Sequence, residues 1–269
     1  SRRFVELETE TVASSNPAFS NEVFDHYRHS PAFGVSRSQV MTVQGTVGKT
    51  SLLLAILTAC GIWSWNATLN NGLQAQMPLV FISGIGGFVL ALMTIFRPIW
   101  SPWTAPLYAA AEGVFLGIIS LVIETGLGDR LGNHQGIVFK AILLTASVLC
   151  MMLFLYGTRI IRVTDKLRVG VMMATGAVAL FYLLAFVLRM FGIELPLLYD
   201  SSIAGIGFSL FVVGLASVNL LLDFDMIEKG ALHGAPKYME WYGAFGLMVT
   251  LIWLYLEILR LLRKFADER

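Results

Sequence analysis

Long apolar runs alternate with short polar stretches along most of the chain. Seven runs are long enough for a helix that crosses a bilayer, which needs about 20 apolar residues. They are Lys49–Trp65, Met77–Phe96, Trp103–Ile123, Gly136–Tyr156, Val169–Leu188, Ser202–Leu222 and Tyr238–Leu262. Pro196 and Pro236 fall between runs, where a proline can separate one helix from the next. The pattern predicts an all-α integral membrane protein with seven transmembrane helices.

The composition agrees with this class. Hydrophobic residues make up 56% of the chain and charged residues 14%, whereas soluble domains carry roughly 45–50% and about 25%. The net charge of +1 gives no indication of a nucleic-acid partner. The polar start of the chain predicts an arm over residues 1–45, followed by a transmembrane domain over residues 46–269.

Basic residues in the short loops predict the orientation. The loop Gly157–Arg168 holds four basic residues and one acid, whereas the loop Asn66–Gln76 holds no charged residue. By the positive-inside rule, the amino-terminal arm and the end of the sixth run are cytoplasmic, and the carboxyl terminus lies outside. The basic tail, with Arg260, Arg263 and Lys264, conflicts with that rule.

The sixth run ends in an acidic cluster that begins at Asp223. In a helix, Asn219 and Asp223 lie on one face, four residues apart, and form a short polar stripe. A carboxylate in a membrane segment is costly and by default indicates an ion or proton pathway. The alternative is that Asp223 only reaches into the headgroups. Asp225 lies roughly 200° around the helix, and it can equally be a surface partner of Lys229.

Glu112 is a second acid within an apolar run, near the middle of Trp103–Ile123. It is a candidate ion acceptor or proton carrier, and the alternative is a protonated carboxyl in a structural hydrogen bond. The neighbouring glycines Gly113 and Gly117 have the four-residue spacing of close helix packing. We expect that packing within one chain rather than between two.

Other motifs give no catalytic chemistry. The stretch from Gly45 to Thr50 resembles part of a phosphate-binding loop, but Val43 stands where that pattern needs glycine, and no strand precedes it. The sequence shows no nucleophile–base pair and no metal-ligand spacing. We therefore expect no enzymatic activity, no cofactor and no metal site.

The stretch Leu222–Lys229 resembles the motif of the Bax inhibitor family, with Asp223 as its aspartate. Further blocks resemble a bacterial branch of that family: Asn16–Phe19, Leu107–Gly113, Gly234–Trp241 and Ala244–Leu251. The resemblance extends over nearly the whole chain. It implies a seven-helix bundle with the last helix at its centre, in a bacterial inner membrane, and a pH-sensitive leak of calcium.

In characterised relatives, two aspartates, one from the sixth helix and one from the seventh, share a proton and gate the cytoplasmic end. Asp223 matches the first. The place of the second falls at about Met248 to Thr250, and no acid lies between Glu240 and Glu257. Asp225 or Glu112 could substitute for it.

The resemblance therefore implies a cation leak channel in which Asp223 closes the cytoplasmic end and Glu112 accepts or carries protons. Its partners would be the lipid bilayer, a permeant cation such as calcium, and protons. The resemblance also allows a non-conducting regulator of a membrane protease or a cell-death pathway. That role would involve a membrane protein partner, bound through the arm and the loop Ala231–Lys237.

Overall fold

The computed structural model describes residues 40–131, 136–161, 163–193 and 202–267. Within these residues, seven helices are long and apolar enough to cross a membrane, which confirms the predicted class. They are α2 (Val43–Asn71), α3 (Leu73–Phe96), α4 (Ser101–Leu131), α5 (Ile137–Gly157), α6 (Asp165–Met190), α8 (Ile203–Leu232) and α9 (Met239–Asp267). A single turn of 3-10 helix, η2 (Pro98–Trp100), leads into α4.

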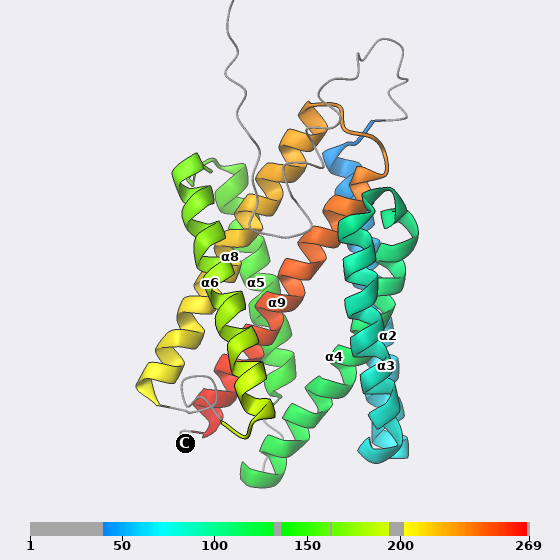
Figure 1. Cartoon of the computed structure of the whole chain (residues 1–269), viewed down its shortest axis with the longest axis vertical. Coiled ribbons are helices and arrows are strands. Elements are labelled where there is room, and N and C mark those ends of the chain that lie inside the picture. The colour runs from blue at the N-terminus through cyan, green and yellow to red at the C-terminus, as the bar shows by residue number, and fades with distance from the viewer. Residues whose placement is uncertain (1–39, 132–135, 162, 194–201, 268–269) are drawn as a thin grey trace, which may run out of the picture.

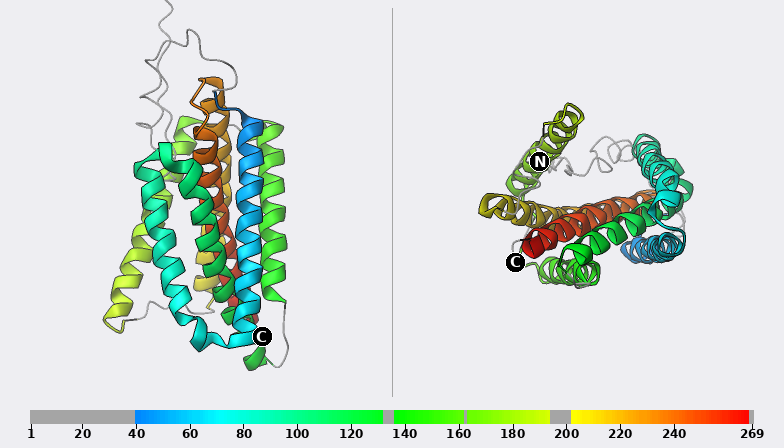
Figure 2. Two further views of the ribbon diagram at one scale, coloured as in Figure 1. Left: turned by 90° about the vertical axis from the view of Figure 1, so that its right-hand side faces the viewer. Right: turned by 90° about the horizontal axis from the view of Figure 1, so that it is seen from below.

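Successive helices run in opposite directions, so the bundle has two ends (Figure 1). We call the end that holds the start of α2 the amino end, and the end that holds the end of α9 the carboxyl end. The helices α8 and α9 form the centre, since 56% of each span is buried, against 11–17% for α2, α3, α5 and α6. Seen from below, α9 runs through the middle of the bundle (Figure 2). The predicted central position of the last helix is confirmed, and α8 shares it.

The helices extend beyond the apolar runs because backbone hydrogen bonds do not depend on side-chain polarity. The helix α8 continues past Leu222 to Leu232, so the whole acidic cluster is helical. The hydroxyl of Thr164 caps α6 by accepting from Leu167 N at 3.3 Å. The prediction that Arg168 lies in a loop is therefore wrong, since α6 already begins at Asp165. Similarly, α2 begins at Val43, inside the predicted arm, of which residues 1–39 lie outside the described residues.

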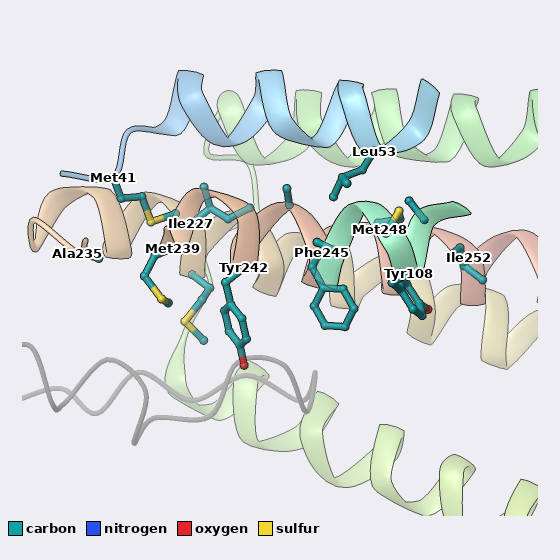
Figure 3. Close-up of a cluster of buried hydrophobic side chains, with 14 of the residues drawn as sticks. Met41, Leu53, Tyr108, Ile227, Ala235, Met239, Tyr242, Phe245, Met248 and Ile252 are labelled. Atoms are coloured by element: carbon teal, nitrogen blue, oxygen red, sulfur yellow. The ribbon is translucent and has the colours of Figure 1, made fainter. Parts of the chain in front are cut away.

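A row of buried side chains along α9 builds the core of the amino half (Figure 3). Tyr242, Phe245 and Met248 are fully buried. Their neighbours come from α2, α4 and α8, with Tyr108 packing edge-on against Phe245 at 5.0 Å between ring centroids. This core fixes α9 against the first half of the chain.

The glycines of α4 bring it into backbone contact with α2. A Cβ atom added at Gly113 would overlap the carbonyl oxygen of Leu57, and one at Gly117 would overlap that of Gly61. The four-residue glycine spacing thus serves packing within the chain, as the sequence predicts.

Candidate functional site

Asp223 lies on the central helix α8, nine residues before its end, and its side chain is 0% exposed. Asn219, one turn earlier on the same face, is 3% exposed. Ala216 and Val212 continue this face towards the carboxyl end and are also buried. The polar stripe thus lies inside the bundle, which is where ionisable residues of membrane segments almost always face. The role of the stripe stays a prediction.

Asn219 directs the stripe towards α6. Its side-chain amide donates to the hydroxyl of Thr175 on α6 at 2.9 Å and to the carbonyl oxygen of Leu215 at 2.9 Å. Leu222 and Leu215 pack on α6 as well, in a cluster with Val171. The acid Asp223 is therefore adjacent to the contact between α8 and α6.

Asp225 has a partner that sequence reasoning missed. Arg168 of α6, whose side chain is 3% exposed, donates through Nη2 to Asp225 at 2.7 Å and through Nη1 to Asp165 at 3.1 Å. The expected partner Lys229 also lies at 3.2 Å from Asp225. Asp225 is thus part of a charge cluster between α6 and α8. These contacts give no support to the idea that Asp225 takes the role of the missing second aspartate.

Glu228 lies beyond the apolar run, where a solvated side chain is expected, but it makes two polar contacts within the protein. Its carboxylate accepts a hydrogen bond from the hydroxyl of Tyr156 on α5, and Arg159 lies at 3.3 Å. It therefore connects the last turns of α8, at the amino end of the bundle, to α5.

Glu112 belongs to the contact between α4 and α3. A Cβ atom at Gly87 of α3 would lie 3.0 Å from its Oε1 atom, and its carboxylate interacts with the hydroxyl of Tyr108 one turn earlier. Since α3 and α6 stand apart on the two sides of the bundle (Figure 2), Glu112 and the Asn219 contact belong to different parts of the molecule. The structure does not bring Glu112 and that contact together.

Glu240 and Glu257, the acids of α9 whose side chains the structure describes, are engaged elsewhere. Glu240, at the helix start, is fully buried and accepts from Lys49, from Lys237 at 2.7 Å, and from the backbone N (2.9 Å) and hydroxyl (2.8 Å) of Thr42. Glu257 accepts from Tyr182 of α6 at 2.7 Å and from Arg260 at 2.7 Å. At the predicted place of the second aspartate stand Met248 and Thr250, both buried.

Three residues of α6 thus contribute polar contacts that sequence reasoning did not identify: Arg168, Thr175 and Tyr182. Their spacing of seven residues is the signal that could have found them, since it places all three on one helix face. Among the described residues, no group of three or more His, Cys, Asp or Glu side chains could hold a metal ion. The chemistry that the arrangement offers is the binding and release of a proton or a cation at a buried carboxylate.

A family model described as Bax inhibitor 1 like matches residues 16–267. No curated protein and no solved structure matches the chain. The matched range includes all seven helices that carry the contacts described above.

Proposed function

The chain belongs to the Bax inhibitor 1 like family, and on that premise we propose that it is a pH-sensitive leak channel for calcium or another cation. The full burial of Asp223 beside Asn219, on a helix long enough to span the membrane, carries the proposal. An ionised carboxylate buried inside a protein is costly unless a positive charge or hydrogen-bond donors compensate it. A cation that reaches it lowers that cost, so Asp223 is a natural binding point on a permeation path.

In this proposal Asp223 closes the amino end of the pathway, and this end is cytoplasmic in a bacterial inner membrane. The helix ends and turns at that end hold Arg159, Arg168, Lys229 and Lys237, which supports this orientation by the positive-inside rule, although the basic tail of α9 lies at the opposite end. Protonation of Asp223 removes its charge, changes its contacts and thereby shifts the population of the open state. Glu112 acts as a second acceptor or proton carrier, and the protein catalyses no chemical reaction.

The proposal is tested by ion flux in proteoliposomes at several pH values, with an encapsulated calcium dye. Asp223→Asn should change the flux several-fold and weaken its dependence on pH. Glu112→Gln should change either the flux or its dependence on pH. Glu228→Gln is the matched control, since it removes an acid from the same helix without touching the buried stripe. A parent protein without flux contradicts the proposal. The same holds if Asp223→Asn and Glu112→Gln both leave the flux and its pH dependence unchanged.

A non-conducting regulator is the second candidate, because the root of the arm meets the turn between α8 and α9. Val40 pairs with Pro236, and Met41 N donates to Ala235 O at 2.7 Å. A partner could therefore contact the arm and this turn together. Co-purification of a stable membrane protein partner that disappears when residues 1–39 are removed, with no flux in the parent, favours this role.

A further inference from the structure

The helix α6 is attached to the bundle differently from the others. Among the described helices it packs mainly against α8, with a polar contact to α9 through Tyr182 and Glu257, and towards the carboxyl end it leans away from the bundle (Figure 2). Its remaining surface is apolar and exposed, as expected for a face towards lipid: Val169, Met173, Leu180, Leu183, Leu184 and Phe186. The contact of α6 with α8 and α9 therefore determines whether α6 stays in place.

We call this contact the α6 seam, and it repeats every seven residues. Arg168, Thr175 and Tyr182 form its polar row. The buried residues three positions after each of them form its apolar row: Val171, Val178 and Ala185. Each polar residue binds a polar partner on the central helices, at Asp225, Asn219 and Glu257, respectively. The three contacts are distributed over 14 residues of α6, which is about 21 Å along the helix.

The polar row contributes most of the free energy that holds α6 specifically at this seam. Apolar side chains gain little from helix association in a membrane, because lipid tails are equally apolar. Interhelical polar contacts contribute about 0.6–2 kcal/mol each. Three of them give about 2–6 kcal/mol by that range, which is comparable to the few kcal/mol that separate two functional states of a protein. By contrast, α2 and α4 interlock through backbone contacts at Gly113 and Gly117.

The middle contact of the seam connects it to the buried acid. Thr175 binds Asn219, which lies one turn from Asp223 on the same face of α8. When α6 moves away, the Asn219 amide loses this partner and the face becomes accessible. The side chains of Asn219 and Asp223 on this face both carry oxygen atoms, and oxygen ligands are those that calcium prefers.

From these contacts we infer that α6 is the gate helix, and that the cation reaches Asp223 along the α6 seam. This inference rests on the proposed channel function and adds the route and the moving element. Arg168 and Tyr182 act as positioning residues that keep α6 closed, one at each end of the seam.

The test measures access of water-soluble reagents to the seam. Both cysteines that the chain contains are first replaced (Cys60→Ala and Cys150→Ala). Leu222→Cys then reports on the seam, since Leu222 is buried there. Leu53→Cys is the matched control, since Leu53 is equally buried but lies in the core between α2 and α9.

In this background, Arg168→Gln and, separately, Tyr182→Phe should increase the rate of labelling at Leu222→Cys by a charged thiol reagent. Each loss of about 1.4 kcal/mol corresponds to a tenfold larger open population, so we expect roughly tenfold. Arg168→Lys should restore part of the slow rate, because a cation near Asp225 is kept. The rate at Leu53→Cys should not change. The inference is wrong if labelling at Leu222→Cys does not increase, or if it increases equally at Leu53→Cys.

Flux measurements on the same variants separate this inference from the proposed function. In a conducting parent, Arg168→Gln and Tyr182→Phe should both increase the calcium flux. Faster labelling at Leu222→Cys with an unchanged flux contradicts a route along the seam, although α6 moves. A parent without any flux refutes the channel function itself, whatever the labelling shows.

Discussion

Replacing Gly113 by alanine should push apart two helices that the native chain holds in backbone contact. The new Cβ atom would overlap the carbonyl oxygen of Leu57 and lie 3.0 Å from the Cβ atom of Cys60. The first of these is a backbone atom, so α2 itself must shift. Overpacking of this kind costs about 1–3 kcal/mol, and the better helix propensity of alanine returns up to about 1 kcal/mol. We expect a net loss of about 1–2 kcal/mol in the free energy of unfolding.

The matched control is Gly126→Ala in the same helix. A Cβ atom at Gly126 meets no other atom within 4 Å, so only the gain in helix propensity remains and this variant should be as stable as the parent or more so. Thermal unfolding in detergent, followed by tryptophan fluorescence, measures both. With about 2–4 °C per kcal/mol, Gly113→Ala should melt about 2–8 °C lower. If Gly113→Ala melts at or above the temperature of Gly126→Ala, the close contact between α2 and α4 is wrong.

Two further predictions concern polar contacts of α9. Glu240→Gln should lower the free energy of unfolding by about 3–5 kcal/mol because it leaves Lys49 without its buried counter-charge. Lys237→Gln should lower it by about 1 kcal/mol or less because Lys237 is half-exposed. Equal losses for the two variants in unfolding experiments would contradict this ranking. Ser120→Ala and Tyr255→Phe each remove the same 2.6 Å hydrogen bond between α4 and α9. A double-mutant cycle should therefore give a coupling free energy of about 1 kcal/mol. A coupling free energy near zero would show that the two hydroxyls do not interact.

The sequence predicted the elements well because hydropathy determines which segments enter the membrane. It placed the helix ends less well. The apolar run before Asp223 stops at Leu222, but the helix continues to Leu232. A charged side chain ends the apolar run without breaking the backbone hydrogen bonds of the helix. For the same reason the charged residue Arg168 was predicted to lie in a loop, although it is a buried helical residue.

The candidate site was predicted only in part because the partners of its residues come from distant helices. The spacing of Asn219 and Asp223 indicated a shared face, and the structure buries that face. No local pattern showed that Asn219 binds Thr175 or that Glu240 binds Thr42, 198 residues away. The basic tail conflicted with the orientation rule, and no local pattern showed where its charges would lie. Lys264 is buried and donates to the carbonyl oxygen of Gly205 at 2.8 Å, so its charge has a partner inside the protein.

The central position of α9 also has a consequence for how the protein is made. Chains fold from the amino terminus as they are synthesised, yet here the central helix α9 is synthesised after the six other described transmembrane helices. Until then, Lys49 and Thr42 lack the carboxylate of Glu240, and the outer helices surround a place that is not yet filled. We therefore expect a message that ends before residue 239 to yield a chain whose core and whose partner for Lys49 are missing.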